Sequence, residues 1–221
     1  MKIATWNVER LKHYKDLDEI CHICNMIKAD ILVLTETDSR ISLDYEYCYQ
    51  TPLLAKSQSE FYSPTENRVS IYTNYKCKRQ YPTYDEQTAI CVELETERGG
   101  LLIYGTIIGI FGNREKSFKP DLEQQTEDIK NLTKNGANIC AIGDYNLSFS
   151  DNYYYTKYGR DLIKDTFDEY GIRIITADRQ ECIDHIAISE KYIGDSRIHI
   201  DEWNYDKSLS DHKGIVAEIM L

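Results

Sequence analysis

Residues 139–146 read ICAIGDYN, a short apolar run that ends in Gly-Asp-Tyr-Asn. An apolar run of this length, bounded by turn residues, is typical of a buried strand. Gly, Asp and Asn are also ordinary turn residues, so one such stretch marks a turn more often than a functional site. The stretch decides the fold because four other parts of the chain repeat its arrangement.

In each of those parts, a predicted apolar strand carries polar residues at one end. The polar segments are Trp6-Asn7-Val8-Glu9, Thr35-Glu36-Thr37-Asp38, Asp184-His185 and Ser210-Asp211-His212. Five coincident clusters are hard to explain as turns alone. If the five strand ends share one rim of the fold, their carboxylates, amides and imidazoles form a single pocket.

A pocket of this composition favours metal-assisted chemistry on phosphate. Carboxylate and amide oxygens select hard divalent cations, so Mg²⁺ is the expected cofactor and Mn²⁺ the alternative. The cation would neutralise phosphate charge, a carboxylate would activate water, and a histidine would stabilise the developing charge. The pattern therefore predicts hydrolysis of a phosphate ester.

The apolar periodicity alternates between that of strands and that of helices. It predicts helices at 16–28, 121–134 and 159–170, and strands at 2–6, 31–35, 45–50, 69–74, 89–95, 101–108, 139–143, 172–176, 184–189, 197–203 and 214–219. This order is one of β-meanders interrupted by single helices, not a βαβ repeat. We expect an α+β (mixed α/β) fold, a four-layer sandwich of two mixed β-sheets packed face to face with helices outside, in a single domain over 1–221.

The composition excludes several classes of protein. With 42% hydrophobic residues in 221, the chain can bury a full core and is neither disordered nor fibrous. The 26 Lys and Arg against 37 Asp and Glu give a net charge of −11, which argues against sequence-blind electrostatic binding to nucleic acid or membranes. No signal core or membrane-length apolar run is present, so we expect a cytoplasmic monomer without a membrane anchor.

Taken together, the ordered motifs WNVE, TETD, GDYN, IDHIAIS and SDHKG resemble those of the endonuclease/exonuclease/phosphatase superfamily, which has the deoxyribonuclease-I-like fold. The resemblance extends from Ile3 to Ile219. It implies a Mg²⁺-dependent phosphodiester hydrolase, a nuclease that cleaves DNA or RNA by attack of an activated water on phosphorus. The alternatives are a phosphatase or phosphodiesterase for small-molecule or lipid phosphoesters, and an inactive binding module of the same fold.

The resemblance also implies a role for each polar cluster in holding the metal. Glu36 matches the principal metal-binding glutamate of the superfamily. Asn7 matches the amide that supports both the metal and the phosphate. Glu9 stands where some members carry an acidic residue near the metal, and Asp211 matches an aspartate beside it.

The catalytic roles follow by the same resemblance. Asp144 and Asn146 match the residues that align and activate the attacking water. His212 matches the histidine that contacts the scissile phosphate, and Asp184 the aspartate that orients it. His185 follows Asp184 on a strand and should face the opposite side, which favours a structural role.

One feature departs from the superfamily pattern. Many members carry a second histidine, or a tyrosine, at the end of the central strand of the first half. The matching region, 104–109, contains no histidine, and the leaving-group position falls on Thr or Ile near Thr106–Ile108. Tyr104, Asn113, Arg114 or a metal-bound water are the candidates to replace it.

Aromatic and basic residues near the motifs are candidates for substrate binding. Those predicted to contact substrate are Tyr145, Arg10, Lys12, Arg114, Tyr155, Lys157 and Arg160. Tyrosines can stack on bases while Lys and Arg hold phosphate; the alternative is a packed surface helix at 153–160 and a solvated loop at 10–15. Trp203 is expected in the core. The seven cysteines are expected to be reduced and buried, and Cys21-His22-Ile23-Cys24 does not favour a zinc site, because no second pair lies nearby.

Overall fold

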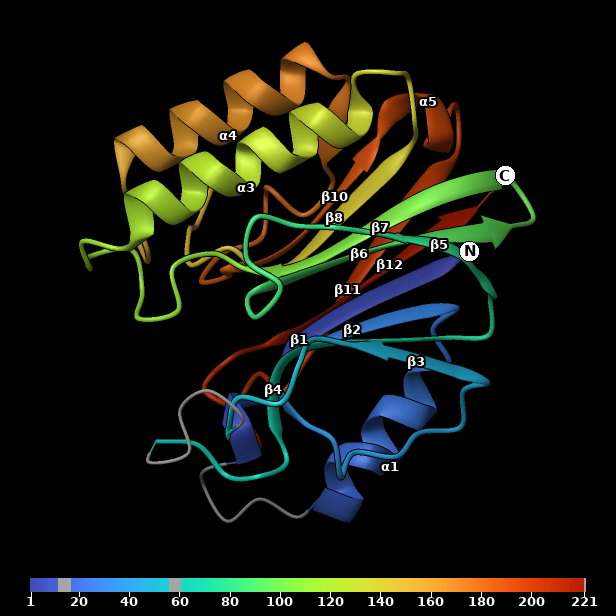
Figure 1. The fold of residues 1–221 in the computed structure, drawn as a ribbon, viewed down its shortest axis with the longest axis vertical. Coiled ribbons are helices and arrows are strands. Elements are labelled where there is room, and N and C mark those ends of the chain that lie inside the picture. Colours follow the sequence, from blue (N-terminus) through green and yellow to red (C-terminus); the bar gives the residue numbers. More distant parts are fainter. Residues whose placement is uncertain (12–16, 56–60, 221) are drawn as a thin grey trace.

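The computed structural model describes residues 1–11, 17–55 and 61–220. Two six-stranded mixed sheets pack face to face, with helices on both outer faces (Figure 1). The first sheet holds, in order, β11 (Arg197–Trp203), β12 (Gly214–Met220), β1 (Lys2–Asn7), β2 (Ile31–Asp38), β4 (Glu66–Thr73) and β3 (Tyr47–Gln50). The second holds β5 (Cys77–Tyr81), β6 (Ala89–Thr96), β7 (Gly99–Ile107), β8 (Ile139–Asp144), β10 (Asp184–Ser189) and β9 (Ile172–Ile174). The predicted four-layer sandwich is confirmed.

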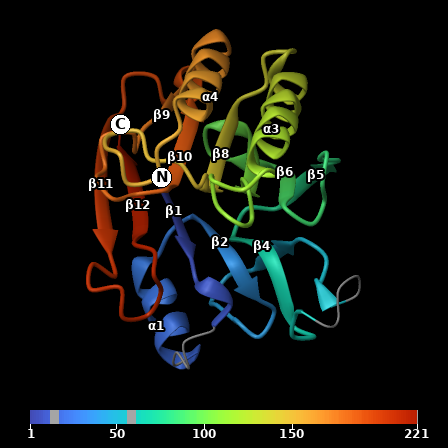
Figure 2. The same ribbon diagram turned by 90° about the vertical axis from the view of Figure 1, so that its left-hand side faces the viewer.

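The helices form the outer layers. They are α1 (Leu17–Ile27), α3 (Phe118–Thr133), α4 (Lys157–Glu169) and the short α5 (Glu190–Ile193), with a 3₁₀ turn, η1 (Glu9–Leu11). Figure 2 shows α3 and α4 side by side over the second sheet, while α1 lies against the first sheet on the opposite side of the molecule. None of the helices in these described ranges is long and apolar enough to cross a bilayer.

The apolar pattern of the strands explains the layers. In β2, Ile31 and Val33 lie in the core between the sheets, whereas Leu32 and Leu34 pack toward α1. Both faces of the strand are buried, which explains the continuous run ILVL instead of an alternating pattern. Trp203 is half-buried and packs edge-on against the buried Trp6 with ring centroids 5.8 Å apart, so it lies at the margin of the core in which it is expected.

The sheet topology brings the five polar strand ends to one rim. Strands β1 and β2 are parallel neighbours, as are β7 and β8, so their C-terminal ends meet at the same edge of each sheet. Strands β10 and β12 run antiparallel to β8 and β1, which places their first residues at that edge. The register pairs Asp184 directly with Asp144.

Three elements, η1, β5 and α5, are not among those predicted from the sequence. Strand β5 was not predicted because its CKRQY sequence is largely exposed and lacks an apolar alternation. Helix α5 was not predicted because it is a single turn. The cysteines are all free, and Cys24, Cys91, Cys140 and Cys182 are buried as expected. Contrary to expectation, Cys21 and Cys77 are only partly buried, and Cys48 is exposed on β3 at the edge of its sheet.

Candidate active site

The site is built around Asp144, the last residue of β8, which is 2% exposed. Asn7 Nδ2 donates a hydrogen bond to Asp144 Oδ2 at 3.0 Å, and this bond joins the two sheets. The backbone N–H of Asn146 donates to Oδ1 at 2.8 Å, and its Nδ2 lies 3.3 Å from Oδ2. These donors satisfy the buried carboxylate and fix its orientation.

Asp184 and His212 form a tight pair beside Asp144. Asp184 Oδ2 lies 2.6 Å from His212 Nδ1. Because a carboxylate accepts hydrogen bonds, Nδ1 carries the proton, and the contact sets the orientation of the ring. The other ring nitrogen, Nε2, lies 3.6 Å from Oδ1 of Asp211, whose side chain is 64% exposed, so Nε2 lies toward the open side of the site.

The backbone of His212 is held as firmly as its ring. Trp6 Nε1 and Asn204 Nδ2 donate to the His212 carbonyl oxygen at 3.2 and 2.6 Å. Ser210 Oγ accepts from the His212 N–H at 3.1 Å and donates to the carbonyl oxygen of Asn7 at 2.5 Å. The 210–212 loop is therefore fixed onto the end of β1. Ser210 is a functional residue that its sequence does not reveal, although it lies within the SDH motif.

The electrostatics of the cluster follow from its burial. Burial raises the pKa of Asp144 to about 7 against the opposing charge of His212, and the negative charge of Asp184 adds to the rise. Burial alone would favour the neutral form of His212, but Asp184 and then Asp144 outweigh it and raise the pKa of His212 to about 10. At neutral pH the site therefore holds an imidazolium beside two acidic side chains.

Three of the residues expected to bind metal or take part in catalysis have left-handed backbone conformations. The φ angles of Glu9, Glu36 and Asn146 are +50°, +43° and +48°. In β2, Thr35 pairs with Val69 and Thr37 with Asn67, but the pairing omits Glu36 between them. Strain of this kind in non-glycine residues gathers at functional sites, because it turns a side chain in a direction that regular structure does not allow.

The residues present fit a hard divalent cation. Asp144, Asp184 and His212 each place a ligand-type atom within 4.8 Å of the others. Asp184 Oδ1 is buried and makes no hydrogen bond to the described residues, so one carboxylate oxygen of the site lacks a partner. The half-buried Glu36 lies close enough for its charge to act on Asp144. The carboxylate oxygens of Asp144, Asp184 and Glu36 are donors of the kind that suits Mg²⁺ or Mn²⁺.

The basic segment after the first motif is only partly available to substrate. Arg10 Nε and Nη2 contact Glu66 Oε2 at 2.8 and 2.7 Å, and its guanidinium stacks over the Tyr62 ring at 4.6 Å. The Arg10 guanidinium is therefore already paired within the protein and is not free to bind a substrate phosphate. Lys12 lies outside the described residues.

Of the residues on the 153–160 segment predicted to bind substrate, two are engaged in contacts within the protein and one is exposed. Arg160 donates to the backbone carbonyl oxygens of Ser148 and Asp151 and stacks over Tyr155, so it is a structural residue. Lys157 pairs with Asp161 one turn further along α4. Tyr155 is 49% exposed and remains available.

The Tyr145 side chain is buried in the core, not open at the rim as expected of a substrate-binding residue. It is 1% exposed, and its hydroxyl donates to the carbonyl oxygen of Ala141 at 3.0 Å within the core. His185 packs against the Tyr145 ring, with Nε2 2.9 Å from the Leu147 carbonyl oxygen and Nδ1 3.0 Å from Thr176 Oγ1. The structural role favoured for His185 agrees with this buried position.

On β7, where many superfamily members carry a second histidine, no described side chain is available to assist the leaving group. Tyr104 is fully buried and donates to Asp128 Oδ2 at 2.9 Å. Thr106 is also buried and donates to the side-chain oxygen of Gln125. Of the candidates named from the sequence, Asn113 and Arg114 remain near the surface and line a cavity.

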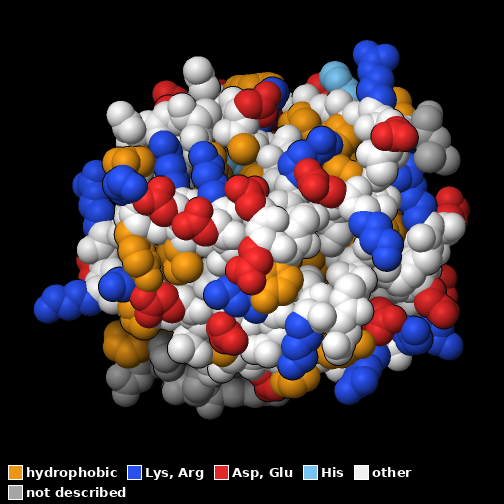
Figure 3. Space-filling model, turned by 90° about the horizontal axis from the view of Figure 1, so that it is seen from above, with side chains coloured by type: hydrophobic (Ala, Val, Ile, Leu, Met, Phe, Trp, Pro, Cys, Tyr) orange, Lys and Arg blue, Asp and Glu red, His pale blue; other side chains and the backbone are white. Residues whose placement is uncertain are grey.

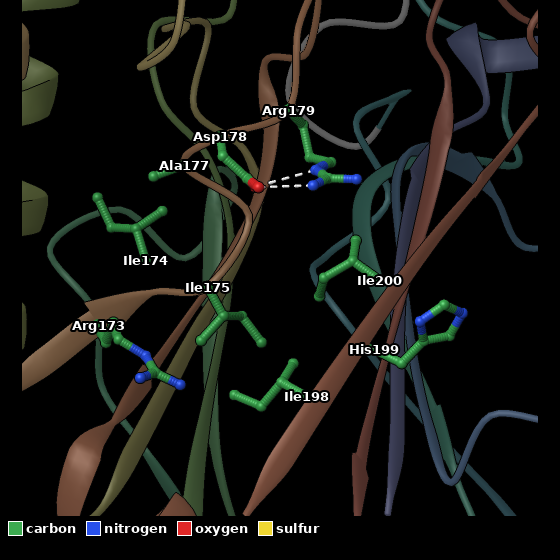
Figure 4. Close-up of a pocket in the computed structure, with 9 residues that line it drawn as sticks. All are labelled: Arg173, Ile174, Ile175, Ala177, Asp178, Arg179, Ile198, His199 and Ile200. Atoms are coloured by element: carbon green, nitrogen blue, oxygen red, sulfur yellow. Dashed lines mark hydrogen bonds and ion pairs between the residues drawn. The ribbon is translucent and has the colours of Figure 1, made fainter.

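Three cavities matter for locating substrate. The largest, about 560 Å³, lies between the edge strands β9 and β11 and has an isoleucine floor, but it contains none of the clustered site residues (Figure 4). A cavity of about 30 Å³ contains Asp184, Asp211 and His212, and one of about 420 Å³ adjoins it, sharing Tyr153 and Tyr154. The clustered Asp184 and His212 therefore lie at the smallest of the three cavities and not at the largest. Phe111 also lines the 420 Å³ cavity, although it is not among the residues expected from the sequence to bind substrate.

Comparison with known proteins gives the fold but no close relative. No family model and no curated protein matches the sequence. Similar solved structures include a 3′ phosphatase from Neisseria bound to a product DNA hairpin, with 16% identity, full coverage of both chains and a TM-score of 0.72. An AP endonuclease from Archaeoglobus fulgidus has 13% identity, full coverage of both chains and a TM-score of 0.70. Beta toxin from Staphylococcus aureus with bound magnesium ions has 16% identity, 98% coverage of each chain and a TM-score of 0.65. The chain therefore has the fold of the endonuclease/exonuclease/phosphatase superfamily.

Proposed function

We propose that the protein is a metal-dependent phosphodiester hydrolase that cleaves nucleic acid. The observation that carries the proposal is the buried cluster in which the Asp184–His212 pair lies beside the Asp144 carboxylate held by Asn7. Structures of the same fold include a 3′ phosphatase bound to a product DNA hairpin and an AP endonuclease, which supports nucleic acid as the substrate class.

The chain's own residues supply the proton chemistry. Asp184 keeps the His212 ring oriented and cationic, so the imidazolium stabilises the negative charge that develops on the phosphate. Asp144, fixed by amides from Asn7 and Asn146, accepts a proton from the attacking water. The orientation of both groups is set before substrate binds, which lowers the entropic cost of reaction.

A divalent cation completes the site. Glu36, Asn7, Glu9 and Asp211 are the residues that would hold Mg²⁺ or Mn²⁺. Three of them are linked, because the Glu9 N–H donates to Asn7 Oδ1 at 2.8 Å and the Asp211 N–H donates to Glu9 Oε2 at 3.2 Å. When bound, the cation would neutralise phosphate charge and favour attack on phosphorus. The bound magnesium in the staphylococcal structure of similar fold supports this assignment.

A substrate panel tests the proposal. Purified protein would be incubated with single- and double-stranded DNA and RNA, inositol and lipid phosphates, and nucleotides, each with Mg²⁺ and with chelator. We expect Mg²⁺-dependent cleavage of nucleic acid. Cleavage confined to small or lipid phosphoesters, which the net charge of −11 also permits, would assign the second class of substrate, and no cleavage of any compound would favour a binding module.

A further inference from the structure

Two loops enclose the cavity of about 420 Å³ beside the site. We call this cavity the aromatic cleft. Its walls are Phe111, Gly112, Asn113 and Arg114 after β7, and Asn152, Tyr153, Tyr154 and Tyr155 after β8. Because β7 and β8 are parallel neighbours, both loops leave the sheet at the rim that carries Asp144. The cleft therefore lies at the same rim as the candidate active site and shares Tyr153 and Tyr154 with the small cavity that contains His212.

Asn146 connects the cleft to the catalytic cluster. Its Nδ2 lies 3.1 Å from the carbonyl oxygens of both Ile108 and Gly109, at the start of the first loop. A methyl group placed on Gly112 would lie 3.9 Å from Asn146 Oδ1 and equally far from Tyr154 Cε1. A ligand group bound in the cleft would therefore lie next to a scissile phosphate bound at Asn146 and Asp144.

The cleft exposes flat aromatic faces. Phe111 is 69% exposed, Tyr155 49% and Tyr153 41%. The Arg160 guanidinium covers Tyr155 at 4.5 Å, and Lys207 Nζ lies 5.0 Å from the Tyr153 ring centre. These cations hold the tyrosine rings in place while much of each ring stays open to solvent. Rings held in this way suit stacking with a planar ligand.

One cation in the cleft is free to bind an anion. Within the parts of the chain that the structure describes, Arg114 makes no hydrogen bond and no ion pair, although it lies near the Tyr154 ring. By contrast, Lys207 donates to the Tyr153 hydroxyl. An unpaired guanidinium beside stacking surfaces matches a phosphate next to a base.

We propose that the aromatic cleft binds an unstacked nucleobase and its adjoining phosphate, so that the preferred substrate is single-stranded nucleic acid. This inference rests on the proposed function and narrows its substrate. In a duplex the bases are already stacked and paired, and entry into the cleft would require extruding one. The net charge of −11 does not favour electrostatic binding to the duplex backbone. On the face formed by α3 and α4, acidic and basic side chains are interspersed, so this face offers no continuous basic surface for a duplex (Figure 3).

Binding measured without catalysis tests the inference. Fluorescence anisotropy, in chelator to prevent cleavage, would give Kd for a single-stranded oligonucleotide (DNA and RNA), for its duplex, and for an abasic strand with the same backbone. The variants are Phe111→Ala and Tyr155→Ala. The matched control is Tyr158→Ala, because Tyr158 is 42% exposed on α4 but does not line the cleft.

We expect the base-containing single strand to bind more tightly than the duplex and the abasic strand. Phe111→Ala and Tyr155→Ala should each raise its Kd by about 5- to 150-fold, the range of one lost stacking contact, and Tyr158→Ala by less than about twofold. From 50 to 200 mM salt, Kd should rise only about 3- to 7-fold, as for one or two phosphate contacts. Equal binding of abasic and normal strands, or unchanged Kd in both cleft variants, overturns the inference. Binding as expected without cleavage in Mg²⁺ would instead count against the proposed function.

Discussion

Replacing His185 with glutamine should make the protein less sensitive to acid. His185 is completely buried between the rings of Tyr145 and Phe149, and Nε2 lies 2.9 Å from the carbonyl oxygen of Leu147. Burial lowers the pKa of His185 to about 4. The ring therefore stays neutral in the folded protein at pH values at which it is protonated in the unfolded chain.

The size of the effect follows from proton linkage. An unfolded histidine titrates near pH 6.5, so above that pH the group has no effect on the pH dependence of stability. As the pH falls below 6.5, the unfolded state gains a proton that the folded state does not, and stability declines until the pH reaches about 4. At pH 4.5 the loss amounts to about 2.5 kcal/mol of the free energy of unfolding.

Urea unfolding at pH 7.5 and at pH 4.5 measures this loss. The quantity to compare is the change in unfolding free energy between the two pH values, because other groups titrate equally in both proteins. His185→Gln should show a loss about 2.5 kcal/mol smaller than the wild type, whereas the control His22→Gln, at an exposed position on α1, should match the wild type. A difference below about 0.5 kcal/mol for His185→Gln would refute the buried neutral ring.

Three further substitutions test the site and its support. His212→Asn removes the contact with Asp184 and should lower kcat/KM for the best phosphodiester by about 10²- to 10⁴-fold; initial rates measure this, and a loss below about threefold would contradict the role of the imidazolium. Gly143→Ala places a methyl group 2.1 Å from the Thr106 carbonyl oxygen at a φ of +136°, so it should cost about 2–4 kcal/mol in urea unfolding, and an unchanged midpoint would contradict this. Glu36→Gln should raise the Mg²⁺ concentration for half-maximal activity at least about tenfold; an unchanged Mg²⁺ titration would mean that Glu36 does not hold the cation.

Much of the fold could be predicted from the sequence because its signals are local. The runs ILVL and ICAIG mark buried strands without any knowledge of their neighbours. The five polar strand ends could be found in the same way, and superfamily resemblance supplied their roles. Strand β5, which is an exposed edge, carries no such pattern and was missed.

The rest of the site depends on tertiary contacts. Tyr145 lies between two site residues in sequence, yet its side chain points into the core beneath α4 because Asp144 and Asn146 occupy the rim. Arg10 looked available for phosphate, and only the fold brings Glu66 against it. Phe111 lines the cleft only because the fold brings the loops after β7 and β8 together. Its local sequence, FGNR, is that of an ordinary turn and does not predict this contact.

The most direct test compares the wild type with Asp144→Asn in single-turnover cleavage of a labelled single-stranded oligonucleotide in Mg²⁺, with folding of both checked by circular dichroism. Asparagine keeps the shape of Asp144 and can still accept from Asn7, but it cannot take a proton from water. The wild type should cleave the strand and stop on addition of chelator, and Asp144→Asn should be slower by about 10²- to 10⁴-fold. Equal rates for the two proteins, or cleavage that continues in chelator, would contradict metal-dependent hydrolysis at this site.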